Sequence, residues 1–213
     1  PSSAASDVYK RQWNLRSVPA WLENPSWGSI VELGDGLEFN AAIRWDAEHQ
    51  QWVYLTPDYQ LNPLEAVYIH ATARDQLGVV FARPPNPTAP PTRRVYRGWN
   101  LIGLAVMPHE PSWGHMPADE ALVSVEQTPE GWRGYNQIIS LYEDLNYEQF
   151  ENYCGSITYS YPWHLHTDAW TYTIGAGEAP EMWIWRGYWL DMENPDNLAG
   201  FSTAPVYYYL YFP

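Results

Sequence analysis

Alternation of apolar and polar positions is the dominant pattern along the chain, and it predicts β-strands. Short stretches rich in aromatic and β-branched residues alternate with a period of two, and Pro, Gly or Asp bounds them. Strands this short, at near-regular spacing, favour an all-β fold of the antiparallel sandwich or small-barrel kind. The predicted strands are 42–46, 51–55, 66–70, 101–106, 123–126, 170–174, 182–191 and 206–212.

Two stretches depart from this pattern and are predicted to be helices. Ser26 stands where an N-cap residue is expected, and Gly34 follows Leu33 where a helix would close, so a short helix is expected between them. Ser140 and Glu143 have the spacing of a capping box, and apolar residues follow at helical period. This second pattern predicts a helix over residues 141–153.

The first half of the sequence recurs in the second half. Trp13-Asn14-Leu15 matches Trp99-Asn100-Leu101 at an offset of 86, and the match includes several Trp and Pro residues that chance rarely pairs. Repetition of this kind predicts two tandem units of one fold. The other matching segments are 25–28 with 111–114, 43–46 with 123–126, Trp52 with Trp132, 66–69 with 187–190, and 75–77 with 196–198.

These matches predict the domain organisation. Repeat unit one spans residues 13–83, a Pro-rich semi-rigid linker spans 84–94, and repeat unit two spans 95–213. The second unit carries a part-helical insertion at about 133–169. Residues 1–12 have no apolar periodicity and resemble translated adapter sequence found at the ends of environmental sequence assemblies. We therefore expect this segment to be foreign to the native protein.

Charge and cysteine content exclude several classes of protein. The chain has 25 acidic and 11 basic residues, a formal net charge of -14, which argues against nucleic acids and anionic membranes because phosphate binding needs clustered Lys and Arg. No apolar run approaches the ~20 residues that span a bilayer, so no membrane insertion is expected. The single cysteine, Cys154, excludes an internal disulfide framework and a Cys-based zinc cluster.

Short aromatic motifs carry a resemblance to a known group. Gly-Trp-Asn-Leu-Ile-Gly at 98–103, Gly-Tyr-Trp-Leu at 187–190 and Asn-Leu at 197–198 resemble the repeat modules of secreted and S-layer-associated prokaryotic surface proteins. In those modules an opening Gly-Trp-Asn-Leu strand and a closing Gly-Tyr-Trp strand bracket an all-β unit. Unit one departs from the pattern, since Gln12 replaces the opening Gly and Glu65-Ala66-Val67-Tyr68 replaces the closing motif.

The resemblance implies a non-catalytic structural or adhesive module of an extracellular or cell-surface protein. Its partners would be glycans or other copies of a surface layer, and it implies no cofactor.

Aromatic residues of the insertion and its flanks give an alternative, a carbohydrate-binding module. Trp183 and Trp185 lie two positions apart, so on one strand they would share a face and could stack on sugars. For the repeated tryptophans we expect core packing instead, because a large ring at a repeated position is usually a core anchor. Those residues are Trp13, Trp27, Trp99 and Trp113, and the candidate ligand-binding residues are Trp163, Trp170, Tyr172, Trp183 and Trp185.

A metal-dependent enzyme is the second alternative. His164 and His166 would lie on one strand face with Asp168 nearby, a spacing that metal sites use. The turn 191–197 is rich in carboxylates, but the matched turn of unit one keeps only Asp75, which favours ordinary solvated turn residues over a calcium site. The sequence contains no nucleophile elbow and no phosphate-binding Gly-rich loop. We therefore expect no catalytic residues and no bound metal.

Overall fold

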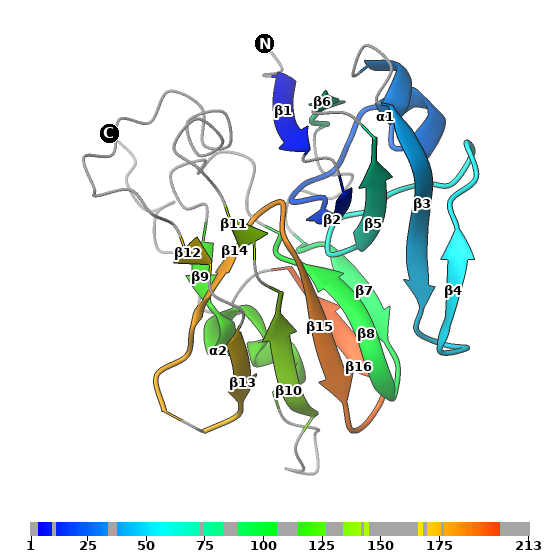
Figure 1. The fold of residues 1–213 in the computed structure, drawn as a ribbon. Helices are drawn as coiled ribbons and strands as arrows, with labels where there is room; N and C mark the ends of the chain where they lie inside the picture. Colours follow the sequence, from blue (N-terminus) through cyan, green and yellow to red (C-terminus); the bar gives the residue numbers. More distant parts are fainter. Residues whose placement is uncertain are drawn as a thin grey trace, which may run out of the picture.

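The computed structural model describes residues 4–9, 12–33, 38–72, 75–82, 89–105, 115–126, 134–141, 143–144, 166–167, 170–175 and 177–200. Within these residues the chain is mostly β, which confirms the predicted all-β class. Its strands form two four-stranded sheets and four two-stranded pairs, all antiparallel (Figure 1). Two short α-helices and one 3-10 helix accompany them.

Sheet one belongs to the N-terminal half of the chain, residues 12–82. Its strand order is β2 (Gln12–Ser17), β5 (Ala66–Ala71), β3 (Phe39–Asp46), β4 (Gln51–Tyr54). Helix α1 (Trp27–Leu33) packs against β6 (Asp75–Val80), and β6 pairs with β1 (Ala4–Tyr9).

Helix α1 begins where the sequence predicts it to begin. Ser26 Oγ accepts a hydrogen bond from the Ser29 backbone N–H at 3.3 Å, as an N-cap side chain does. Trp27 and Ile30, one turn apart, are the buried residues of this helix.

Sheet two belongs to the C-terminal half, residues 89–200. Its strand order is β8 (Gly98–Gly103), β15 (Gly187–Met192), β10 (Tyr135–Ser140), β13 (Trp170–Thr173). The remaining elements are β7 (Thr92–Val95) paired with β16 (Asp196–Ala199), β9 (His115–Pro117) paired with β14 (Glu181–Trp183), β11 (Glu143–Asp144) paired with β12 (His166–Thr167), helix α2 (Ala118–Ala121) and the 3-10 helix Val123–Val125.

The two sheets have the same strand order and the same register between their first two strands. Leu15 of β2 lies opposite Tyr68 of β5, and Leu101 of β8 lies opposite Trp189 of β15. Leu101 lies 86 positions after Leu15, and Trp189 lies 121 positions after Tyr68. These are the offsets at which Trp-Asn-Leu and the segment 66–69 recur in the sequence.

A register irregularity recurs in the next strand pair. In sheet one it falls between Phe39 and Ala41 of β3, and in sheet two between Tyr135 and Gln137 of β10. Both irregularities face the corresponding residues of the closing strands, β5 and β15. Bulges of this kind bend a strand and are specific features of a fold, so their recurrence is informative.

The flanking strand pairs correspond as well. Tyr9 lies opposite Asp75 where β1 pairs with β6, and Val95 lies opposite Asp196 where β7 pairs with β16. Strand β1 lies inside the segment that the sequence marks as foreign, and β7 begins inside the predicted linker. The foreign origin of residues 1–12 stays a prediction.

The predicted strand at 123–126 is wrong. Val123–Val125 forms a 3-10 helix that contacts β16, and Val125 is buried. By register, Ile43 corresponds to Ile139, because these residues lie opposite Tyr68 and Trp189 respectively. A short apolar run does not distinguish a strand from a buried helical turn, and that ambiguity misplaced the sequence match.

The predicted helix at 141–153 is wrong in its described residues. Ser140 ends strand β10, and its hydroxyl donates to the Leu141 carbonyl at 3.4 Å instead of capping a helix. Glu143–Asp144 forms β11. Strand pairing has thus overridden a local cap signal. Tyr142 and residues 145–153 lie outside the described residues, as do the predicted strand 206–212 and Trp132.

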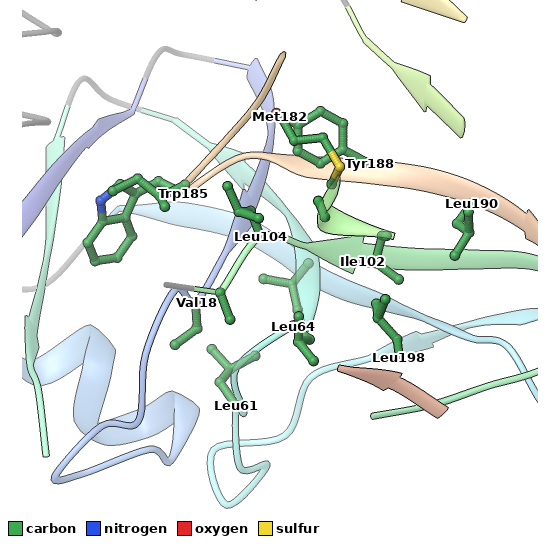
Figure 2. Packing of buried hydrophobic residues seen from close by; sticks show 14 of the residues in the cluster. Val18, Leu61, Leu64, Ile102, Leu104, Met182, Trp185, Tyr188, Leu190 and Leu198 are labelled. Carbon is green, nitrogen blue, oxygen red and sulfur yellow. The ribbon is translucent and has the colours of Figure 1, made fainter. Parts of the chain in front are cut away.

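One hydrophobic core extends through both halves (Figure 2). Val18, Leu61 and Leu64 of the N-terminal half belong to the same cluster as Ile102 and Leu190 of the C-terminal half. The two sheets are therefore packed into one body over the described residues, and their stabilities are coupled.

Candidate functional site

The residues proposed from the sequence as a ligand platform mostly pack inward. Tyr172 is 6% exposed and Trp185 8% exposed, and the Trp185 ring packs on Phe81 at 5.6 Å between centroids. Trp170 is half-buried against Tyr188, at 5.7 Å. Rings packed in this way offer little surface to a sugar.

Trp183 and Trp185 do not share a strand face. Strand β14 ends at Trp183, and Trp185 lies in the following turn with φ 66°. Trp183 is half-buried and packs on the His115 ring at 4.5 Å. Trp163 lies outside the described residues, and the binding role of all five residues stays a prediction.

An aromatic surface that the sequence did not identify lies on the outer side of sheet one. Because side chains alternate along a strand and paired residues share a side, the residues of each sheet divide into a core side and an outer side. The core side carries buried residues such as Ala42, Val67 and Ile69. We call the outer aromatic residues the aromatic face; they are Trp13, Trp45, Trp52, Tyr54, Tyr68 and His70, joined by Trp99 and Trp189 of sheet two.

Three rings of the aromatic face are well exposed. Trp13 and Trp52 are each 47% exposed and Tyr54 is 73% exposed. Trp13 and Trp52 both make edge-on contacts with Tyr68, at 6.3 and 5.5 Å between centroids. The expectation that Trp13 is a core anchor is therefore wrong, whereas Trp27, at 3% exposed, is one. Trp99 is half-buried on the aromatic face, not in the main core, and Trp113 lies outside the described residues.

Half-buried rings of both sheets support the exposed ones. Trp189 of β15 contacts Trp45 and Trp52, each at 5.6 Å between centroids, and its Nε1–H donates to the Tyr68 hydroxyl at 3.1 Å. The Trp45 Nε1–H donates to the Trp99 carbonyl at 2.8 Å. Because both indole N–H groups are hydrogen-bonded, these rings are held in fixed orientations.

The β3–β4 hairpin is clamped to strand β8 by Gln50. Its side-chain carbonyl accepts from the backbone N–H of Trp99 at 3.1 Å, and its side-chain amide donates to the backbone carbonyl of Trp99 at 2.9 Å. Gln50 itself has φ 51°, and Gly98, with φ 86°, leaves room for its side chain. Trp52 and Tyr54 follow directly on β4, so the clamp fixes the strand that carries them.

Asp46 closes the same hairpin turn. Its carboxylate accepts from the His49 backbone N–H at 3.3 Å and lies 3.1 Å from His49 Nδ1. Burial acts to raise the pKa of Asp46, but the hydrogen bonds from His49 outweigh burial and hold the pKa below its ordinary value. The group is thus a turn-forming carboxylate that stays ionised.

Two backbone hydrogen bonds join the sheets at what we call the seam. Ser17 N–H donates to the Trp185 carbonyl at 3.0 Å, and Gly103 N–H donates to the Leu64 carbonyl at 3.1 Å. The donors are 86 positions apart and the acceptors 121 apart, so corresponding positions exchange equivalent bonds. Leu64 and Trp185 also share an unusual backbone conformation, with φ 68° and 66°.

Side chains at the seam also meet their counterparts. Leu15 and Leu101 pack together, and Gly187 lies against Ala66, where an added Cβ would come within 2.9 Å of the Ala66 Cβ. An added Cβ at Gly103 would collide with Ser17. The seam is therefore self-complementary, as an interface across a two-fold axis is.

A buried polar cluster lies beside the seam. Glu65 accepts from the Tyr59 hydroxyl and from the Asn62 N–H at 3.3 Å, and Arg93 lies 4.0 Å from it. Arg93 also donates to the Leu64 and Leu101 carbonyls. Burial and the Glu65 carboxylate raise the pKa of Tyr59, so this tyrosine keeps its proton and acts as a hydrogen-bond donor.

Metal and membrane sites receive no support from the described residues. Within them, no group of three or more His, Cys, Asp or Glu side chains is placed to hold a metal ion. Residues His164 and Asp168 lie outside that part of the chain, and Asp191 accepts a hydrogen bond from Asn136 at 3.1 Å. Neither α-helix of the described structure is long and apolar enough to cross a bilayer.

Strand β4 carries the signal that would have predicted the aromatic face. Trp52 and Tyr54 lie two positions apart on this short strand, and Trp45 precedes them on the neighbouring strand. Sequence alone did not say which side of the sheet faces the core.

Comparisons of the chain with protein-family models, with curated proteins and with solved structures give no match.

Proposed function

We propose that the chain is a non-catalytic adhesive module of an extracellular or cell-surface protein, built from two tandem β repeat units. Support for the repeat comes from the equal strand order of the two sheets, their matching registers and the recurring irregularity in β3 and β10. The extracellular location follows from the resemblance of the Gly-Trp-Asn-Leu and Gly-Tyr-Trp motifs to surface-protein modules. Glycans or other copies of a surface layer are the partners we propose.

The observation that carries the adhesive role is the aromatic face. Trp13, Trp52 and Tyr54 leave large rings in solvent, and hydrogen-bonded rings of both sheets fix the surface beneath them. Contiguous exposed aromatic surface is unfavourable in water and usually marks an interaction site. A fixed surface loses little conformational entropy on binding, which suits an adhesive contact.

The buried ionisable groups serve the fold in this proposal. Glu65 is buried and accepts hydrogen bonds from Tyr59 and Asn62, and Tyr59 packs against the core beneath Arg44. The alternatives from the sequence, a carbohydrate-binding site on the rings of unit two and a metal-dependent enzyme, gain no observation in their favour.

An adhesion assay tests the proposal. Beads coated with the purified chain are compared, for retention on polysaccharide-coated and protein-coated surfaces, with beads carrying the double variant Trp13→Ala/Trp52→Ala. We expect the double variant to lose retention by about tenfold or more, since hot-spot aromatics dominate binding energy.

The matched control is Leu33→Ala, which removes a side chain of similar exposure, 49%, from helix α1. Circular dichroism verifies that all variants are folded. Equal retention of parent and double variant, or absence of retention by the parent, would contradict the adhesive role.

A further inference from the structure

We propose that the aromatic face binds an uncharged oligosaccharide that lies across Trp13 and Trp52. The inference rests on the proposed adhesive function and names the ligand class of the same surface. Three properties of the face carry it: its charge, its unpaired polar atoms and the spacing of its rings.

The outer side of sheet one is free of carboxylate, ammonium and guanidinium groups. Charged residues of these strands belong to the core side, where Arg16 is buried and Arg44 stacks over the Tyr59 ring at 5.0 Å. The residues of the outer side are Trp13, Leu15, Ser17, Ala41, Ile43, Trp45, Trp52, Tyr54, Ala66, Tyr68 and His70. An anionic ligand would find no opposite charge among them, and the net charge of -14 repels anions further. On the same side of sheet two, Asp191 lies opposite Trp99, and its carboxylate already accepts a hydrogen bond from Asn136 at 3.1 Å.

The exposed rings keep polar atoms available. In the described structure, the Nε1–H groups of Trp13 and Trp52 and the Tyr54 hydroxyl make no hydrogen bond to protein. An apolar protein partner that covered these groups would leave them buried and unpaired, which costs about 1–3 kcal/mol for each group. A saccharide avoids this cost because its hydroxyl groups can pair with them.

Sugar rings also match the ring faces. The C–H groups on one side of a pyranose are weakly positive, and the face of an indole or phenol ring carries negative charge density, so the two attract while water is displaced. A ligand that presents C–H groups on its faces and hydroxyl groups on its edges therefore complements both features of the aromatic face.

The spacing of the rings requires several linked sugars. Trp13 lies on β2 and Trp52 on β4, which are three strand intervals apart at ~4.8 Å each. Tyr68, on β5 between them, contacts both rings. A single sugar covers one ring only, so affinity should rise with chain length until both tryptophans are covered.

Fluorescence titration of the full chain tests the inference, with indole emission as the readout. The probes are glucose, the neutral tetramers of β-1,4-linked glucose, N-acetylglucosamine and mannose, and the anionic tetramer of galacturonic acid. We expect at least one neutral tetramer to bind about tenfold or more tighter than glucose and than the anionic tetramer.

Single variants locate the site. Trp13→Ala and Trp52→Ala should each weaken binding of that tetramer by about tenfold, whereas Leu33→Ala should leave it unchanged. Trp185→Phe, which alters the ring proposed from the sequence, should also leave binding unchanged provided the chain stays folded.

Other outcomes overturn the inference. Absence of binding to all three neutral tetramers, tighter binding of the anionic tetramer, or unchanged binding by both Trp→Ala variants would each exclude an uncharged glycan on this face. Association of the chain with itself, seen by sedimentation and abolished by Trp52→Ala, would assign the face to a second copy. If the bead assay still shows tryptophan-dependent retention, the adhesive function stands although the glycan inference fails.

Discussion

The two four-stranded sheets have the same strand order and differ in the side chains that they present to solvent. Tyr54 lies opposite Ile43 on β3, and the residue in the same place of sheet two is Thr171, opposite Ile139. Where sheet one carries aromatic rings on β4, the described part of β13 carries Thr171 and Thr173 on its outer side. The core side and the seam positions of the outer side, such as Leu15 and Leu101, are thus constrained by packing, while outer positions away from the seam differ between the sheets.

The repeated Trp-Asn-Leu tripeptide shows which positions the plan constrains. Asn14 and Asn100 are both buried on the core side and bond to backbone carbonyls, at 3.5 Å to Ile69 and at 2.6 Å to Tyr96. Leu15 and Leu101 pack together at the seam. The tryptophans of the two tripeptides, Trp13 and Trp99, lie on the outer side, and their environments differ. Trp13 is 47% exposed, whereas Trp99 is half-buried against Trp189.

The largest effect is expected in the shared core. Trp185→Ala should lower the free energy of unfolding by about 3–5 kcal/mol, because it empties a large buried aromatic site. Its counterpart Leu64→Ala should cost about 2–5 kcal/mol. Since one core extends through both halves, each variant should shift a single urea transition seen equally by circular dichroism and by tryptophan fluorescence. Two transitions, of which only one moves, would show that the halves fold independently.

A smaller effect is expected at the seam. Gly187→Ala places a methyl group against Leu15 and Ala66, and overpacking of this kind costs about 1–3 kcal/mol. The double variant Gly187→Ala/Ala66→Gly returns space to the same contact and should recover part of the loss. Urea denaturation of the two variants measures both values. Equal stability of Gly187→Ala and parent would mean that the sheets do not meet as closely as the structure shows.

The smallest effect concerns the flanking strand pairs. Deletion of residues 1–9 removes β1 and leaves the β6 edge unpaired, so backbone amides of β6 should exchange hydrogen faster. The free energy of unfolding should fall by at least about 1 kcal/mol, because each backbone hydrogen bond contributes about 0.5–1.5 kcal/mol and the pair extends over six residue pairs. The β7–β16 pair, which the deletion leaves intact, is the internal control. Unchanged exchange and stability would support a foreign origin of the N-terminal segment.

Local patterns predicted helix α1 and the strands β3, β4, β5, β8 and β13, but they missed other strands, such as β10 and β16, and the pairing of distant segments. The strand at 66–70 and the cap at Ser26 follow from alternation and from one side-chain hydrogen bond, both of which are local. The turn at Trp185 depends instead on a backbone bond from Ser17, far away in the sequence. Sequence periodicity does not report contacts between distant segments, so it predicts one continuous strand over residues 182–191, where the structure has two.

The candidate site was misplaced for a related reason. Trp13 and Trp185 are both tryptophans in aromatic surroundings, and composition alone does not say which one is covered. Trp13 stays exposed because it lies at the end of β2 away from the seam, where sheet two covers Leu15 and Ser17 on the same side of the strand. Phe81 and the seam cover Trp185. Burial depends on tertiary packing, and local sequence patterns do not specify which tryptophan is covered by distant segments.

The equivalence of the two seam bonds has a consequence for assembly. Each half contributes one donor and one acceptor, Ser17 and Leu64 on one side and Gly103 and Trp185 on the other, and all four are occupied within the chain. Such a contact has closed point symmetry, because two units pair all of its donors and acceptors and leave none for a third unit. Growth of a lattice or filament from this molecule would have to proceed through a different surface, and tethering both halves in one polypeptide gives the seam a high effective concentration that no dilution can remove.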